Sequence, residues 1–276
     1  MNRRPPRTPR LLAFVLATSA LLTTAACSGS DGDGGEQGRA DVSASPVAEK
    51  SPTASASAKA LTAAGAKAAL LTEADLEDDW TQVKDAATWR DSLLIGKVKV
   101  ADFLTGKADA ADCQKLLDAL YGDDLLGKPT GASALTGFAD GGDARLLQQV
   151  AAYDQSRLDK SLAWLKTLPV TCDQFTVTGG DAGRRTVQVV ETSLPGVGDA
   201  RQGLRVTLKG ETDGSPTTLT LDVAAVRIGP NALTVTGGGL DGLEDDTTEQ
   251  AVRQGTDRLE DVLTGRTPPA QPGDGY

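Results

Sequence analysis

Apolar residues recur at intervals of three and four positions in three segments of the chain, and this spacing predicts a helix in each. The segments are 112–121, 154–168 and 247–264. We expect Pro169 to stop the second helix, because proline has no amide hydrogen to donate. Asp246 and Glu249 have capping-box spacing, so the third helix should begin there.

Between and after these helices, apolar and polar residues alternate, as they do in half-buried strands. The predicted strands are 133–138, 146–152, 186–190, 204–208, 218–223, 226–228 and 233–235. The turn residues Gly229, Pro230 and Asn231 predict a hairpin between the last two. The sequence therefore predicts an α+β fold, in which an antiparallel sheet of about five to seven strands is covered by helices on one face.

The N-terminal segment does not fit this fold. Residues 1–10 carry four arginines and no acid, and 11–26 form an apolar run that ends in small residues before Cys27. A basic region, an apolar core and a small-residue exit are typical of a secretory signal peptide. The run of 16 residues is shorter than the roughly 20 of a membrane-spanning helix, so an uncleaved anchor is the less favoured alternative.

The ending Thr24-Ala25-Ala26-Cys27 resembles a bacterial lipobox, although Thr24 stands where leucine is usual. The resemblance implies that residues 1–26 are a lipoprotein signal peptide and that Cys27 becomes the lipidated N-terminus. Ordinary signal cleavage, with Cys27 a bystander, is the main alternative. Loss of the signal would change the net charge from -10 to -14. A lipid anchor would hold so acidic a chain at an anionic membrane surface.

Composition divides the rest of the chain. Residues 27–60 are rich in Ser, Ala and Gly and have no aromatic residue, so we expect a lipidated Cys27 followed by a disordered tether. The tether would span roughly 30 Å as a coil. Residues 61–265 are long enough for one α+β domain with its own core, and the proline-containing tail 266–276 is expected to be disordered.

Composition also excludes several chemistries. The chain has no histidine, which removes the Ser-His-Asp triad, the Cys-His dyad and HExxH zinc hydrolysis. Its acidity, with a pI near 4.6, argues against nucleic acid as a partner. No nucleophile elbow or phosphate-binding loop is present, and we predict no catalytic residue, no cofactor and no metal site.

Three groups of residues remain as weaker candidates. The glycine-rich segment 237–242 is interpreted as a flexible loop between a strand and the last helix, with a ligand-gating loop as the alternative. The acidic groups 75–79 and 241–246 are interpreted as solvated loops and helix caps, with a cation site or a glycosidase-like carboxylate pair as the alternative. The tryptophans are expected in the core first and in a pocket second; they are Trp80, Trp89 and Trp164.

Two cysteines are left once Cys27 is assigned to lipid. Thiols outside the membrane oxidise, so we predict a disulfide between Cys113 and Cys172. Two buried free thiols are the main alternative, and a metal pair is less favoured because two cysteines without histidine make a poor site.

The order of elements resembles actinobacterial surface lipoproteins that carry the extracellular sensor domain of mycobacterial receptor Ser/Thr kinases. The resemblance covers about residues 70–265 and is carried by Ala111-Asp112-Cys113, Leu162-Ala163-Trp164-Leu165, Cys172 and Val226-Arg227-Ile228-Gly229. That family tends to use two disulfides, whereas this chain can form one. The resemblance implies a sheet-and-helix domain with a cleft for an extracellular ligand.

These features predict a non-catalytic, membrane-anchored lipoprotein on the extracellular face of the cell membrane, with a ligand-binding or sensor-type domain. Its expected partners are the membrane, through the lipid anchor, and a small-molecule, lipid or envelope-protein ligand; we expect a monomer. A structural partner for another envelope protein, which would show an exposed apolar patch, is the first alternative. A cell-wall hydrolase that uses carboxylates alone is the second.

Overall fold

The structure is a computed structural model that describes residues 60–76, 79–95, 98–240, 242–244 and 246–269. All of them belong to one compact unit, Ser55–Tyr276. The predicted signal peptide, the lipidation site Cys27 and the tether up to residue 59 lie outside the described residues, and so does the tail from residue 270. In the described part of the chain, no helix is both long enough and apolar enough to span a membrane.

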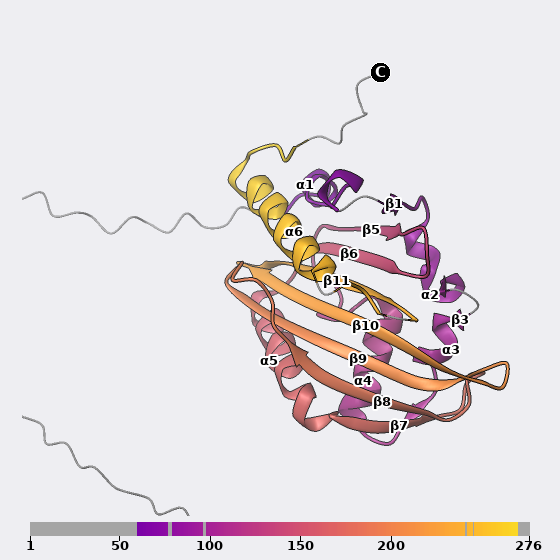
Figure 1. Ribbon diagram of the computed structural model, residues 1–276. Helices are drawn as coiled ribbons and strands as arrows, with labels where there is room; N and C mark the ends of the chain where they lie inside the picture. The colour runs from indigo at the N-terminus through magenta and orange to yellow at the C-terminus, as the bar shows by residue number, and fades with distance from the viewer. Residues whose placement is uncertain (1–59, 77–78, 96–97, 241, 245, 270–276) are drawn as a thin grey trace, which may run out of the picture. The chain divides into compact units, whose positions relative to one another are not determined.

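A single antiparallel sheet of nine strands dominates the described residues (Figure 1). In spatial order the strands are β1 (Thr81–Gln82), β5 (Ser133–Ala139), β6 (Arg145–Ala152), β11 (Asn231–Gly239), β10 (Ser215–Ile228), β9 (Ala200–Thr212), β8 (Arg185–Thr192), β7 (Gln174–Thr178) and β4 (Lys107–Ala108). A separate two-stranded ribbon joins β2 (Leu94–Ile95) to β3 (Val98–Lys99). The predicted hairpin is confirmed, since Ile228 pairs with Asn231 across Gly229-Pro230.

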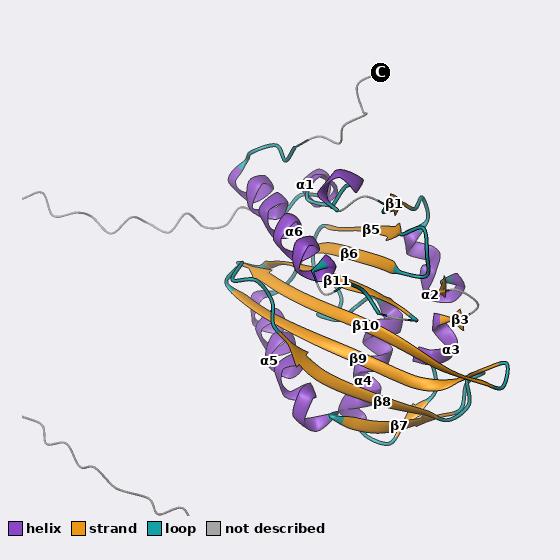
Figure 2. Cartoon of the chain, viewed as in Figure 1, coloured by secondary structure: helices purple, strands orange, loops and turns teal. Residues whose placement is uncertain are grey.

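Helices lie on both faces of the sheet rather than on one (Figure 2). They are α1 (Ala63–Ala68), η1 (Glu73–Asp75), η2 (Ala86–Thr88), α2 (Trp89–Ser92), α3 (Val100–Leu104), α4 (Ala111–Gly122), α5 (Gln155–Thr171) and α6 (Thr247–Thr264). One core cluster joins α3, α4 and α5 to β7–β10, and a second joins α1 and α6 to β5, β6, β11 and β10. The expectation of a single covered face was wrong because β10 has apolar side chains on both sides.

The α+β class is confirmed, but the sheet has more strands than the five to seven predicted. The edge strands β1 and β4 are two residues long, too short to show alternation, and the short strand β7 was not recognised either. Conversely, the segments predicted as separate strands at 218–223 and 226–228 are one strand, β10. Ala224 and Ala225 are both buried there and break the alternating pattern.

The predicted bounds of α6, 247–264, are confirmed, whereas the predicted end of α5 and the predicted capping box of α6 were wrong. Helix α5 continues through Pro169 to Thr171, because a proline removes only one donor and Cys172 N still bonds Leu168 O at 2.8 Å. The predicted capping box at α6 does not form. Asp246 makes no side-chain capping bond there, and Glu249 instead pairs with Arg253 at 3.0 Å.

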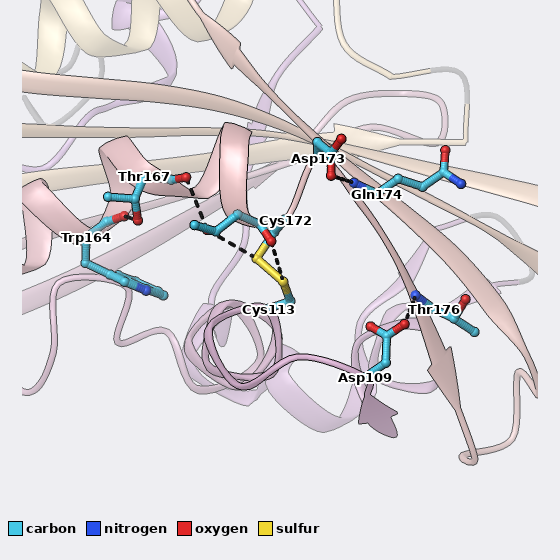
Figure 3. Close-up of a disulfide and its surroundings, with 9 residues drawn as sticks. Asp109, Cys113, Trp164, Thr167, Cys172, Asp173, Gln174 and Thr176 are labelled. Carbon is cyan, nitrogen blue, oxygen red and sulfur yellow. Dashed lines mark hydrogen bonds between the residues drawn. A yellow bond between two sulfur atoms is a disulfide. The ribbon is translucent and has the colours of Figure 1, made fainter.

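The structure contains the predicted disulfide between Cys113 and Cys172 (Figure 3). Cys113 lies in the first turn of α4 and Cys172 directly follows α5, and their Cα atoms are 5.6 Å apart. Both residues are buried in the core cluster that α4 and α5 share with the sheet. The bond therefore fixes the helical layer on this face.

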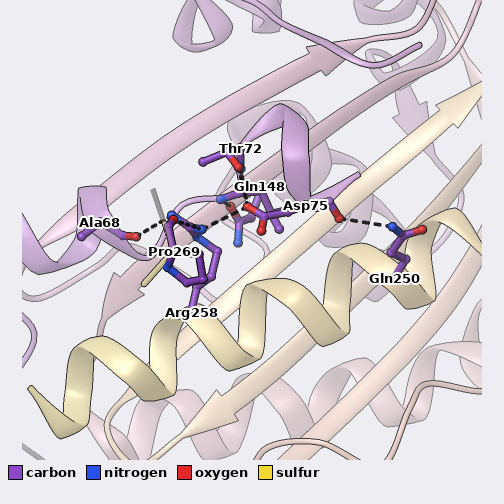
Figure 4. Close-up of polar contacts among 8 residues, drawn as sticks. Ala68, Thr72, Asp75, Gln148, Gln250, Arg258 and Pro269 are labelled. Carbon is purple, nitrogen blue, oxygen red and sulfur yellow. Dashed lines mark hydrogen bonds and ion pairs between the residues drawn. The ribbon is translucent and has the colours of Figure 1, made fainter. Parts of the chain in front are cut away.

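A buried ion pair fixes the start of the domain against its last helix (Figure 4). Arg258 Nη1 on α6 lies 3.2 Å from Asp75 Oδ2, and both side chains are almost fully enclosed. Arg258 also donates to Ala68 O and Pro269 O, each at 3.1 Å. Asp75 in turn accepts bonds from the backbone and hydroxyl of Thr72. Together these five contacts join α6 to α1, to η1 and to the segment that follows α6.

Replacing both Cys113 and Cys172 by alanine should lower the free energy of unfolding by about 4 kcal/mol, because the bond closes a long loop in the unfolded chain. Urea unfolding of the double variant and of oxidised wild type measures the difference. Reduced wild type should resemble the double variant. Equal midpoints for oxidised wild type and the double variant would contradict a stabilising bond.

Candidate functional site

An apolar cleft lies between the short helices at one end of the domain and the sheet. Its walls are Trp89, Leu93, Ile95, Val100, Leu104, Leu120, Tyr121 and Asp123, and its floor is Arg145, Leu147, Leu221, Thr236, Gly237 and Gly238. The walls come from α2, β2, α3 and α4, and the floor from β6, β11 and β10. The cleft therefore lies between helices and sheet, where a ligand-binding domain was expected to have one.

Strand register sets the order of residues across the floor. Leu221, Gly238 and Arg145 form one cross-strand row, because Gly238 pairs with Leu221 on one side and with Arg145 on the other. Thr236 and Leu147 form the adjacent row. Side chains two residues apart on a strand face the same way, so these rows present one continuous surface to the cleft.

Two glycines allow close packing at the cleft. A Cβ atom at Gly238 would lie 2.7 Å from Leu221 Cδ2 and closer still to the Thr220 carbonyl oxygen. A Cβ atom at Gly137 would lie 3.0 Å from two ring carbons of Trp89, so this glycine lets the indole pack onto the sheet. Glycine inside a strand costs stability and is typical of places where another group approaches closely.

The predicted loop at 237–242 was therefore wrong for its first three residues, Gly237-Gly238-Gly239. These glycines end β11, which is paired with β10 on one side and, up to Gly238, with β6 on the other. On the opposite face, Leu243 occupies the space that a Cβ of Gly237 would need. The run of glycines is therefore explained by the close neighbours on both faces of β11 and not by a turn.

A buried arginine positions the α3 wall. Arg185 is fully enclosed and donates hydrogen bonds to the carbonyl oxygens of Thr105, Gly179 and Gly183. Thr105 is the C-cap of α3, so the cation meets the negative end of the helix dipole. Burial lowers the pKa of Arg185, and the charge of Asp102 opposes that shift. Through Thr105, Arg185 holds in place the helix that supplies Val100 and Leu104.

The cleft is small, with a volume of about 60 Å³. One water molecule requires about 10–15 Å³ on this scale, so the cleft holds about four to six water-sized groups. A narrower extension of about 10 Å³ continues between Ala119 and Leu125 on one side and Gln149 and Thr234 on the other. It shares Leu120, Asp123, Leu147 and Thr236 with the main cavity.

Among the lining residues that the structure describes, Asp123 and Arg145 are the charged ones. Asp123 is the C-cap of α4 and has left-handed backbone angles, with φ of 53°. Arg145 Nη1 donates to Ala144 O at 2.7 Å and to Gly142 O at 3.1 Å, and it lies 3.7 Å from Asp140 Oδ1. The cleft thus combines an apolar interior with one acid and one base.

The structure assigns the other candidate residues as follows. Trp89 lines the cleft, Trp80 packs on the core cluster of α1 and α6, and Trp164 lies beneath Lys115, whose Nζ is 3.8 Å from the ring centroid. Asp75 belongs to the ion pair with Arg258. Residues 77, 78, 241 and 245 of the two acidic groups lie outside the described residues. Among the described residues, no cluster of three or more Cys, Asp or Glu could hold a metal ion.

A second, polar hollow of about 420 Å³ lies at the loop that joins β8 to β9, lined by Glu191, Thr192, Ser193, Leu194, Arg201, Gln202 and Gly203. Next to it, Asp222 and Glu249 line a cavity of about 40 Å³. Arg205 binds Asp222 through two nitrogens, at 2.7 and 3.1 Å, and Arg253 binds Glu249. On the scale used for the apolar cleft, this cavity has room for about three or four water-sized groups.

No family model matches this chain, and no curated protein matches it. Among solved structures, the chain is similar to the extracellular domain of PknH from Mycobacterium tuberculosis, with 14% identity and a TM-score of 0.43 over 74% of this chain and 98% of that one. It is also similar to a putative uncharacterized protein, an Rv0999 ortholog, from Mycobacterium smegmatis. There the identity is 18% and the TM-score 0.37, over 72% and 96% of the two chains. At these values neither similarity bears on what this chain does.

Replacing Gly238 by alanine should lower the free energy of unfolding by about 1–3 kcal/mol, because the added methyl group would collide with Leu221 and Thr220. Gly141 is the matched control: a Cβ there would meet nothing within 4 Å, and its φ is not positive. Gly141→Ala should change stability by less than about 0.5 kcal/mol. Equal urea midpoints for the two variants would contradict the tight floor.

Proposed function

We propose that this chain is a membrane-anchored extracytoplasmic lipoprotein whose folded domain binds a small molecule without transforming it. The observation that carries the proposal is the apolar cleft between α2–α4 and the sheet. Small-molecule sites are concave and mainly apolar, with a few polar groups that orient the ligand. The described lining of this cleft has that composition.

The distribution of exposed side chains favours a small ligand over a docked protein. Among the described residues, the large hydrophobic side chains that are exposed are Val170 and Val190. They lie in different elements, one near the end of α5 and the other in β8. A protein-docking surface would show a contiguous apolar patch of several hundred Å² instead.

The carboxylate hydrolase is less well supported. Glycosidases need two carboxyl groups about 5–10 Å apart around the sugar. The apolar cleft has one carboxylate, Asp123, in its described lining. Asp222 and Glu249 share a cavity, but arginines bind both and the cavity holds only about 40 Å³. We therefore propose binding rather than hydrolysis.

The anchor part of the proposal comes from the sequence. Cys27 follows a lipobox-like segment, and a Ser/Ala/Gly-rich stretch separates it from the domain that starts near Leu61. Such a chain would hold the cleft tens of ångströms from the membrane and leave it accessible to molecules outside the cell.

Replacing Cys27 by serine should move the protein from the detergent phase to the aqueous phase of a Triton X-114 partition, because the acylated thiol is lost. The neighbouring change Ser28→Ala is the control and should leave the protein in the detergent phase. Wild-type protein in the aqueous phase, with residue 27 unmodified by mass spectrometry, would disprove the anchor.

A panel of short alkyl compounds, lipids and cell-wall fragments should contain compounds that raise the melting temperature, because a ligand that binds only the folded state stabilises it. Leu147→Phe should abolish these shifts by filling the cleft from its floor. Val190→Phe, on an exposed strand position outside the cleft, should keep them. Shifts that persist in Leu147→Phe, or none with any compound, would count against the proposed function.

A further inference from the structure

We propose that the polar hollow at the β8–β9 loop binds an extended peptide of two or three residues, which adds a short strand to the sheet beside Arg201. This site is separate from the apolar cleft, so the inference goes beyond the proposed function. Three properties of the hollow lead to it: a strand position that β8 leaves empty, backbone groups that face this position, and polar side chains beside it.

Strand β9 extends further than β8, the strand beside it. Its pairing with β10 continues through residues 200–202, whereas its pairing with β8 stops where Thr192 meets Gly203. In the same register, Leu194 would be the residue opposite Arg201. Within the described part of the chain, residues 200–202 therefore have a neighbouring strand on one side only.

Leu194 leaves the sheet because it packs over Gly203. A Cβ atom at Gly203 would lie 2.9 Å from Leu194 Cγ and 2.6 Å from Thr192 O, so the glycine lets the chain cross this face of the sheet. Leu194 then packs against the core cluster of α1 and α6. Pro195 follows it and has no N–H to offer a strand ladder. The hollow of about 420 Å³ lies between the end of β8 and the start of β9, where the next part of β8 would otherwise lie.

The backbone of Arg201 faces the position that β8 leaves empty. Thr212 and Ser215 close the two-residue turn between β9 and β10, and the closing pair of such a hairpin exchanges both backbone hydrogen bonds. Successive residues of a strand bond to opposite sides, so even-numbered residues of β9 bond β10 and odd-numbered residues point toward β8. Arg201 is odd-numbered, and no described residue bonds its backbone N–H or C=O.

An extended peptide matches these groups. A residue placed opposite Arg201 in antiparallel pairing would exchange two hydrogen bonds with it, as paired strand residues do. Peptides that add a strand to a sheet edge gain affinity from main-chain bonds and specificity from neighbouring side chains. The neighbours here are polar, namely Ser193 and the buried amide of Gln202, whose Nε2 donates to Glu191 Oε1 at 3.2 Å. The three residues of β9 without a partner on this side limit the added strand to two or three residues.

Two uncharged peptides test the inference from the side of the ligand. One is the acetylated trialanine dimethylamide, and the other is the same peptide with its three alanine nitrogens methylated. Each is titrated into purified wild-type protein, and the dissociation constant is taken from NMR shifts of the amides of residues 200–203. We expect the methylated peptide to bind at least about tenfold more weakly, because it cannot donate the hydrogen bond to Arg201 O.

Two variants of one residue separate the backbone from the side chain. Arg201→Pro and Arg201→Ala both remove the guanidinium, but only the proline also removes the N–H that faces the hollow. Proline is tolerated in a strand where the lost N–H does not bond a neighbouring strand. Arg201→Pro should bind the unmethylated peptide at least about tenfold more weakly than Arg201→Ala does. Urea unfolding shows whether the proline variant is folded, and if it is not, the comparison of the two peptides decides.

Hydrogen exchange at the Arg201 amide tests whether the position is empty. Exchange should be fast in the free protein and slow with the unmethylated peptide. Slow exchange without peptide would mean that another segment of the chain, or a second copy, occupies the position, and would overturn the inference. Equal binding of the two peptides, or equal binding by folded Arg201→Pro and Arg201→Ala, would also overturn it. Shifts along the floor of the apolar cleft and none at residues 200–203 would overturn it too, but would leave the proposed function intact.

Discussion

Strand β10 is buried on both faces, and the positions of the long helices follow from this constraint. Its six residues Leu221–Val226 are all buried. Leu221 and Val223 face the layer of α4 and α5, whereas Ala224 and Val226 face α6. Consecutive apolar side chains along one strand require a covering layer on each side. On the second face, α6 packs mainly on β10 and β11, whereas β8 and β9 have exposed polar side chains there, among them Thr186, Gln188 and Lys209.

The cleft lies where the elements that cover the other face of the sheet change from one long helix to several short elements. Over β8 and β9 that cover is α5, a helix of 17 residues that the disulfide ties to α4. Over β6 and β11 it includes α2, β2 and α3, none longer than five residues. Such short elements cannot seal a sheet as a long helix does. Trp89 closes one side by packing on Gly137, Arg185 holds α3 at the other, and a hollow remains above Gly238.

Much of this fold could be predicted from local pattern. Leucine spacing located α4, α5 and α6, because each has one apolar stripe facing a core, and the number of cysteines indicated the Cys113–Cys172 pair. The two-residue edge strands were missed, since their pairing is decided by the neighbouring strand and not by their own sequence. Pro169 misled because tertiary packing and the bond from Cys172 carry the helix past it.

The residues that line the cleft could not be predicted, because they come from segments up to about 150 positions apart in the chain. One signal for it was present in the sequence. Glycines inside a strand lower its stability and are typical of places where another group approaches the backbone closely. Gly238 is such a place, since it pairs with Leu221 and a Cβ there would collide with that side chain. Arg145 could not be assigned to the cleft from the sequence, because it is the strand register that places it beside Gly238.

The central claim is that this hollow holds a small molecule in the native protein. Native mass spectrometry of the protein purified from the membranes of the organism that makes it tests this most directly. The account predicts an additional mass from a bound small molecule on wild-type protein and the bare mass for Leu147→Phe. A bare wild-type protein, or a compound that Leu147→Phe retains, would contradict it.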